Sequence, residues 1–286
     1  MGWKVPEDTA KHVVFLKVII QSKDEFFNDL KDRIRASGND SAFLFIHGYN
    51  VSFKVAARRT AQIWYDLNFK GAPVFYSWPS QGNMIWSSKD IGLAYSADED
   101  AIVWTQKHLK EFLKDFFAQT KAQNVYLIAH SMGNRALKDT VIALLAEEPS
   151  LRQRLKEIIL AAPDIDADIF KQQIAKELAA SSSSTLYASS EDCALKLSEK
   201  IHGGYPRAGD SGQGLTVVPG IETVDASDMD TSLFGCVTDW GHSYFADNRS
   251  VLADIFYLIR DGLRADQRFS LRSVDTQEGR HWVFKK

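Results

Sequence analysis

The stretch VYLIAHSMGN, residues 125–134, decides the fold of this chain. Its apolar start, 125–129, predicts a strand buried on both faces, and residues 132–146, rich in Ala and Leu, predict a helix directly after it. Between the two lies Ser131, with Ala129 two residues before it and Gly133 two residues after it. A serine in this setting forms a nucleophile elbow, because small neighbours allow the sharp turn that holds the hydroxyl clear of the sheet. Ser131 is therefore the predicted nucleophile.

Two backbone amides are predicted to stabilise an oxyanion beside Ser131. The helix after the serine directs its positive end at the reacting centre, so the amide of Met132 can donate to the developing charge. Upstream, the stretch FLFIHGYN (43–50) predicts a strand that ends in His-Gly. The residue after that glycine, Tyr49, supplies the second predicted amide, and Gly48 allows the chain to approach a substrate closely.

Short apolar runs alternate with helical periodicity along the chain, which predicts an α/β fold with a mostly parallel central sheet and helices on both faces. The predicted strands are 13–20, 41–46, 73–78, 125–129, 158–162, 185–188 and 221–224, and the predicted helices are 98–117, 132–146 and 250–263. We expect one domain over 1–286, with a core at about 41–264.

Three details of this organisation are also predicted. Ser250 is the expected N-cap of the last helix. The glycine-rich stretch 203–220 is expected to form a long loop with little packing capacity. The tail, 265–286, is expected to add an edge strand.

Composition excludes several classes of function. With 34 Lys and Arg against 37 Asp and Glu, the net charge is −3, which argues against a nucleic-acid-binding protein. The sequence contains no run of about 18 apolar residues, so it predicts no membrane-spanning helix. The first residues have no apolar signal-peptide core, and we therefore expect a cytoplasmic protein. Cys193 and Cys236 are too few for a disulfide framework or a four-cysteine zinc site. No phosphate loop or His-Glu-x-x-His pair is present, so we expect neither a cofactor nor a metal.

Four motifs in order, HGYN (47–50), YSWPS (76–80), AHSMGNR (129–135) and AAPDID (161–166), resemble the α/β-hydrolase superfamily. More narrowly, the chain resembles a bacterial branch catalogued as domain of unknown function 900, over about 43–263. The resemblance implies an α/β-hydrolase fold, a triad in the order Ser, acid, His, and esterase or lipase-type activity. It implies no particular substrate.

Four aspartates are candidates for the triad acid: Asp164, Asp166, Asp168 and Asp192. Asp164 and Asp166 follow the strand at 158–162, and Asp192 follows the next strand. The superfamily usually carries its acid after that later strand. The residues there, 189–195, resemble the pattern Ser-x-x-Asp-x-Ala-Leu of the branch, so the resemblance favours Asp192. Its role would be to hold the tautomer of the imidazole. Asp164 and Asp166 remain alternatives.

The predicted base is His242. The implied order excludes the histidines before Asp192, while His202 lies only ten residues after it, at the end of a predicted helix, and His281 lies in the tail. His242 follows the last strand of the predicted core and precedes the last long helix, where a loop can carry an imidazole back over Ser131.

A second serine motif, GDSGQG (209–214), matches the Gly-Asp-Ser-Gly of trypsin-like proteases. Those proteins are all-β and place histidine and aspartate before the serine, so we interpret the match as chance. Tryptophans near strand ends, Trp78, Trp86 and Trp240, are candidates for an apolar acyl site, and with Gly48 we assign Trp78 and Trp240 to the substrate pocket.

The sequence therefore predicts a serine hydrolase for a small-molecule carboxylic ester. The alternatives are an acyltransferase or thioesterase with the same triad, and a non-catalytic scaffold that uses the fold for binding. The acyl group, the alcohol group and the oligomeric state are left open.

Overall fold

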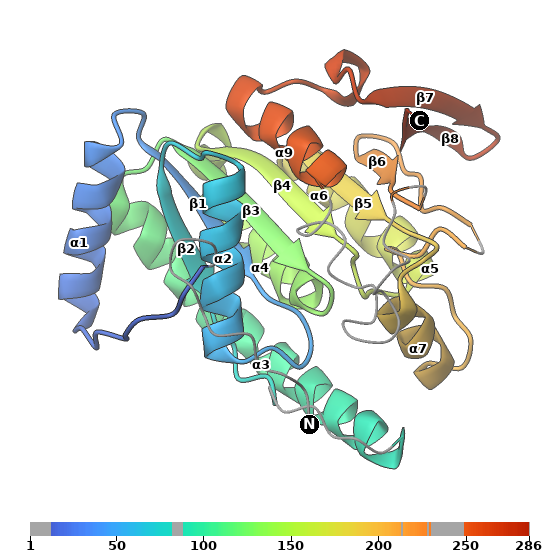
Figure 1. The fold of residues 1–286 in the computed structure, drawn as a ribbon, viewed down its shortest axis with the longest axis horizontal. Coiled ribbons are helices and arrows are strands. Elements are labelled where there is room, and N and C mark those ends of the chain that lie inside the picture. The colour runs from blue at the N-terminus through green and yellow to red at the C-terminus, as the bar shows by residue number, and fades with distance from the viewer. Residues whose placement is uncertain (1–12, 82–87, 213, 228, 230–248, 286) are drawn as a thin grey trace.

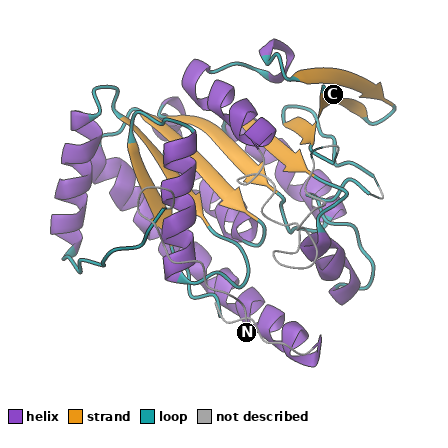
Figure 2. Ribbon diagram, in the orientation of Figure 1, coloured by secondary structure: helices purple, strands orange, loops and turns teal. Residues whose placement is uncertain are grey.

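The computed structural model of the chain describes residues 13–81, 88–212, 214–227, 229 and 249–285. Within these residues, one sheet of eight strands lies between two layers of helices (Figure 1). The predicted α/β fold, with a mostly parallel sheet covered on both faces, is therefore confirmed (Figure 2). No helix in the described parts of the chain is long and apolar enough to cross a lipid bilayer.

The strands are β1 (Ser41–Ile46), β2 (Ala72–Tyr76), β3 (Asn124–His130), β4 (Leu155–Ala161), β5 (Ser184–Ala188), β6 (Glu222–Asp225), β7 (Leu271–Thr276) and β8 (Gly279–Phe284). They lie in the order β2-β1-β3-β4-β5-β6-β8-β7, and every neighbouring pair is parallel except β7 and β8. Strands predicted between residues 41 and 224 are thus found, with ends that shift by a few residues.

The helices are α1 (Lys23–Ala36), α2 (Phe53–Asp66), α3 (Ser88–Thr120), α4 (Gly133–Glu147), α5 (Ala167–Ile169), α6 (Ala175–Ser181), α7 (Cys193–Ile201) and α9 (Arg249–Asp261). Short turns of other helical types, η1 (Pro149–Gln153), η2 (Phe170–Ile174) and η3 (Ala265–Gln267), complete the described regular structure. Because α9 already includes Arg249, Ser250 lies in its first turn, and its prediction as the N-cap is wrong.

Two hydrophobic cores lie on opposite faces of the sheet, because successive side chains of a strand point to opposite faces. On β1, Leu44 and Ile46 contribute to one core, and Phe43 and Phe45 contribute to the other. The first core is closed by α1, α3, α4 and α6, and the second by α2 and α9 (Figure 1). The buried strands are therefore apolar on both faces, which is why they could be recognised as continuous apolar runs.

The tail adds two strands where one edge strand was expected. Residues 271–284 form the antiparallel hairpin of β7 and β8, and β8 pairs in parallel with β6 through Val224 and Trp282. The outer strand of the sheet on this side is β7.

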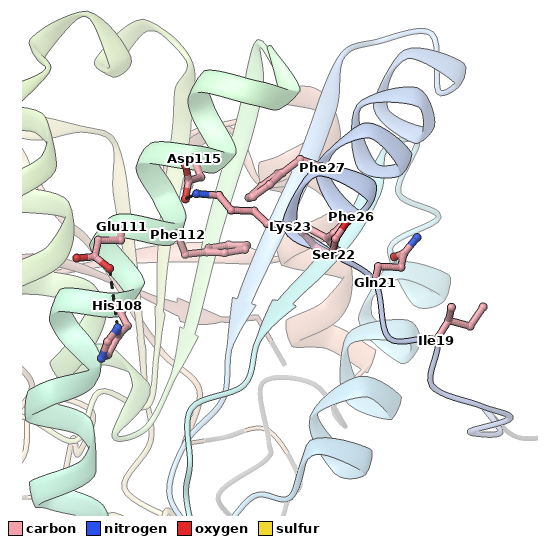
Figure 3. A pocket seen from close by; sticks show the side chains of 10 residues that line it. All are labelled: Ile19, Gln21, Ser22, Lys23, Phe26, Phe27, His108, Glu111, Phe112 and Asp115. Carbon is pink, nitrogen blue, oxygen red and sulfur yellow. Dashed lines mark ion pairs between the residues drawn. The ribbon is translucent and has the colours of Figure 1, made fainter.

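The predicted strand at 13–20 is wrong. These residues form no regular secondary structure, and Leu16 and Ile20 are 82% and 94% exposed. Strand propensity describes how well a residue suits the pleated, half-buried surface of a sheet. This segment pairs with no described strand, so its residues do not form part of such a surface. Ile19 instead lines a cavity of about 420 Å³ between the start of α1 and the C-terminal half of α3 (Figure 3). None of the predicted catalytic residues lines that cavity.

The glycine-rich loop at 203–220 contains no described helix or strand, as predicted, but it packs more tightly than expected. Ala208 and Thr216 are fully buried, and Asp210 is nearly so. Gly209 lies against the turn after β4, where a Cβ atom would come within 2.5 Å of the carbonyl carbon of Ala162. Its lack of a side chain is what allows this contact, so the loop forms part of the protein interior.

A buried ionic cluster fastens α9 to the sheet. Arg268 donates to Asp254 of α9 at 2.6 Å and to Glu222 of β6 at 3.0 Å, and the Tyr187 hydroxyl of β5 donates to Asp254 at 2.7 Å. Burial raises the pKa of Asp254, and the neighbouring Arg268 opposes that rise. The carboxylate of Asp254 therefore depends on Arg268 for its charge compensation.

Arg268→Ala should lower the free energy of unfolding by about 3–5 kcal/mol, because it leaves the buried Asp254 carboxylate without its cation. Urea unfolding at neutral pH measures the change. The matched control is Arg280→Ala, which breaks an exposed pair with Asp275 and should change stability little. Equal losses in the two variants would contradict the assigned role of Arg268.

Candidate active site

Ser131 lies at the turn between β3 and α4 with φ +52°, in the left-handed region. A residue other than glycine pays about 1–2 kcal/mol for this conformation, so the surrounding contacts must hold it there. The Ser131 amide donates to the carbonyl of Ala161 on β4 at 2.9 Å. The Asn134 side chain donates to the carbonyls of Ala129, Ser131 and Ala161 at 3.0–3.2 Å. The turn is strained and firmly held, as a nucleophile elbow requires.

Two glycines let the loop after β1 press against this turn. A Cβ on Gly133 would lie 2.5 Å from the carbonyl oxygen of His47. A Cβ on Gly48 would lie 2.7 Å from Cβ of Ser131 and 3.2 Å from its Oγ. Any side chain at either position would push the loop and the turn apart. We call this contact between Gly48 and Ser131 the elbow contact.

The residues predicted to supply the oxyanion amides flank the elbow contact. Met132 follows Ser131 and is fully buried at the start of α4. Tyr49 follows Gly48 and is half-buried, with its ring centroid 5.2 Å from that of Tyr95 on α3. Burial, with a smaller contribution from Asp98, raises the pKa of the Tyr49 hydroxyl, which therefore stays neutral at physiological pH.

Trp78, predicted for the substrate pocket, packs behind the loop after β1. Its side chain is 2% exposed, its indole donates to the carbonyl of His47 at 2.7 Å, and its ring stacks on the imidazole at 5.2 Å. Burial lowers the pKa of His47, which favours the neutral ring. The described contacts of Trp78 thus support the loop that carries Gly48.

The remaining predicted site residues are partly outside the described chain. His242, Trp240 and Trp86 lie outside the described residues. Asp192 lies after β5, is fully buried and caps α7 by accepting from the amides of Ala194 and Leu195 at 3.0 and 2.9 Å.

The alternative acids have other partners. Asp166 caps α5 through the amides of Asp168 and Ile169, both at 3.0 Å. Asp164 is buried and accepts from Arg207 Nε at 3.0 Å, from Ser198 Oγ at 2.6 Å and from the Tyr95 hydroxyl, with Arg135 Nη2 at 3.3 Å. Burial by itself would raise the pKa of Asp164, but these two arginines, with Ser198 and Tyr95, hold it well below its usual value.

This cluster around Asp164 was not predicted. It joins α3, α4, the turn after β4, α7 and the glycine-rich loop. Its outer part contains Glu99, which pairs with Arg135 and His202 at 2.5 and 2.9 Å. The one signal in the sequence was the arginine of AHSMGNR, a charge in the first turn of the helix that follows the predicted nucleophile.

Two residues that the predicted triad does not include, His281 and Ser211, lie on or beside strands at the β6–β8 side of the sheet. His281 lies on β8 opposite Val274 and is 9% exposed. Ser211, the serine of the GDSG motif, donates to the carboxylate of Asp225 at 3.1 Å and lies 2.8 Å from the Ser227 hydroxyl.

Asp164→Asn should lower the free energy of unfolding at pH 7 by about 3–5 kcal/mol, because the buried Arg207 loses its counter-charge and Arg135 keeps only its pair with Glu99. The folded-state pKa of Asp164 lies below its unfolded value, so its contribution is present above about pH 4 and is lost as the pH falls through the folded pKa. Urea unfolding between pH 7 and pH 3 should therefore show the difference from wild type shrinking on acidification. Asp166→Asn is the control, since asparagine caps helices as well as aspartate. A difference independent of pH would contradict this assignment.

No curated protein matches the chain in sequence. Among solved structures, it is similar to a predicted CIB-like hydrolase from Thermoplasma acidophilum, at 16% identity over 78% of this chain and 88% of that one, with a TM-score of 0.41. It is also similar to lipase B of Aspergillus fumigatus, at 12% identity over 77% of this chain and 52% of that one, with a TM-score of 0.43. A third is carboxylesterase CesB of Bacillus subtilis, at 9% identity over 84% of this chain and 99% of that one, with a TM-score of 0.42. A family model covers residues 22–261, and the chain therefore belongs to the family described as alpha/beta hydrolase of unknown function (DUF900).

Proposed function

We propose that the chain is a carboxylic ester hydrolase in which Ser131 is the nucleophile, His242 the base and Asp192 the acid. The observation that carries the proposal is the left-handed backbone of Ser131 at the β3–α4 turn, with Gly48 against its hydroxyl. A turn of this strain persists only where its surroundings hold it, and in a hydrolase it presents the serine to the substrate. Membership of a hydrolase family supports the same conclusion.

In the proposed reaction, Ser131 Oγ attacks the ester carbonyl carbon while His242 takes the serine proton. The carbonyl oxygen becomes an oxyanion that accepts from the amides of Met132 and Tyr49. His242 then returns the proton to the leaving alcohol as the C–O bond breaks. Water hydrolyses the acyl-enzyme by the same route, with His242 removing a proton from the water and returning it to Ser131 Oγ.

Three features favour Asp192 over the alternative acids. The carboxylate of Asp164 already accepts from two hydroxyls and an arginine and pairs with a second arginine, so it has little capacity left for an imidazole. Asp166 is only half-buried, whereas Asp192 is fully buried. Asp192 also stands after the later strand, β5, where the superfamily resemblance places the acid.

A fluorophosphonate probe should label Ser131, because an activated serine hydroxyl attacks phosphorus as it would attack an ester carbonyl. Intact-protein and peptide mass spectrometry locate the adduct. Ser131→Ala should abolish labelling and the hydrolysis of p-nitrophenyl esters. Ser211→Ala, which removes the serine of the GDSG motif, should leave both unchanged. Labelling at Ser211, or none on folded wild-type protein, would overturn the proposal and leave a binding scaffold as the better reading.

Asp192→Asn should lower kcat by about 10³–10⁴, because the amide favours the wrong imidazole tautomer. Asp166→Asn should change kcat little. The two variants are matched, since both aspartates cap a helix and asparagine preserves a cap. Steady-state hydrolysis of a p-nitrophenyl ester measures both, and equal losses in the pair would contradict the assignment of the acid.

A further inference from the structure

The loop between β1 and α2, residues 47–52, carries the amide of Tyr49 and contains a second strained residue beside it. Asn50 has φ +54°, in the left-handed region. Asparagine tolerates this conformation better than most residues but still needs contacts to hold it. What holds Asn50 therefore also restrains the backbone next to the Tyr49 amide.

The side chain of Asp98, on α3, makes that contact. Its Oδ2 accepts from the Asn50 amide at 3.1 Å and from Ser80 Oγ at 2.5 Å, and its Oδ1 accepts from the Gln81 amide at 2.8 Å. Ser80 Oγ in turn accepts from the Val51 amide at 3.2 Å. One carboxylate thus joins the loop after β1 to the loop after β2.

The burial of Asp98 makes its hydrogen bonds to the two loops important for stability. The side chain is 0% exposed. It has no ion pair with any described lysine or arginine, in contrast to Asp164 with its two arginines. A buried carboxylate without a cation is expensive, and amide and hydroxyl donors are what compensate it. The donors here are two loop amides and one loop hydroxyl, so the cost is offset only while both loops keep this geometry.

We propose that Asp98 is a positioning residue of the oxyanion hole, which holds the Tyr49 amide toward Ser131 through the backbone of Asn50. The proposal rests on the hydrolase function proposed above. Asp98 touches neither the nucleophile nor the predicted acid; it acts through the loop. Gly48 sets how close the loop comes to Ser131, and Asp98 sets how the next amide is turned.

The proposal predicts a specific kinetic effect. An oxyanion donor must lie about 2.7–3.1 Å from the charge that develops in the transition state, and loss of one such donor costs about 10²–10³ in kcat. Asp98→Ala frees the loop but leaves the Tyr49 amide in the chain, so its effect should be smaller than the loss of a donor. We expect kcat to fall by about 10- to 100-fold. KM should stay close to wild type, because the ground-state carbonyl carries little charge.

The conservative variant separates geometry from charge. In Asp98→Asn, the amide oxygen can take the place of Oδ2, which accepts from both Asn50 and Ser80. The contact with Gln81 is lost, because the NH2 group then faces the Gln81 amide, which is also a donor. This variant should therefore recover most of the kcat that Asp98→Ala loses. Ser80→Ala removes the bridge to Val51 and should give a smaller loss than Asp98→Ala. Asp100→Ala, an exposed carboxylate on the same helix, is the control and should behave as wild type.

The test measures kcat and KM for p-nitrophenyl ester hydrolysis, and the Ki of a phenylboronic acid that mimics the tetrahedral intermediate, in wild type and these four variants. We expect kcat/KM and boronate affinity to fall together in Asp98→Ala and to recover in Asp98→Asn. If Asp98→Ala does not fold, Ser80→Ala and Asp98→Asn carry the comparison. An unchanged kcat in Asp98→Ala, or in Ser80→Ala where that variant stands in for it, would overturn the inference alone, as would an Asp98→Asn variant as impaired as the alanine variant. A wild-type protein without Ser131-dependent hydrolysis would overturn the proposed function and this inference with it.

Discussion

The site depends on the elbow contact, where two backbone segments meet without a side chain between them. A Cβ on Gly48 would lie 2.7 Å from Cβ of Ser131, and one on Gly133 would lie 2.5 Å from the carbonyl oxygen of His47. The ends of β1 and β3 are neighbours because the strands pair in register from Ser41 and Asn124 onward. The parallel sheet therefore brings the two segments together, and the glycines allow them to touch.

Buried polar groups fix the loops around this contact. Asp98 joins the loops after β1 and β2 to α3, and Asp164 joins the turn after β4 to α3, α4, α7 and the glycine-rich loop. The segments at the carboxyl end of the sheet are irregular, so their backbone groups cannot be satisfied by strand or helix pairing. The Asp98 carboxylate provides acceptors for two of these amides, whereas the Asp164 carboxylate accepts from side chains. Each carboxylate holds one arrangement of the loops, because a changed geometry would leave a charge uncompensated.

The features that could be predicted from the sequence depend on residues that are close together in the chain. Strands such as β1 and β3 were recognisable because both of their faces are buried, and the elbow because Ala129, Ser131 and Gly133 lie within five residues. The strand predicted at 13–20 failed because apolar composition does not tell whether a pairing partner exists. The partners of Asp164 could not be predicted, since Arg135 and Arg207 lie 29 and 43 residues from it and meet it only through the fold. The packing of Gly209 was missed for the same reason.

The most direct test of the proposed oxyanion hole is a crystal structure of the protein with a phosphonate bound to Ser131. We expect a phosphonyl oxygen that accepts from the amides of both Tyr49 and Met132 at about 2.7–3.1 Å, with the Asn50 amide still bonded to Asp98. An adduct on Ser131 whose oxygen is held by other groups, with the Tyr49 amide turned away, would contradict the proposed oxyanion hole.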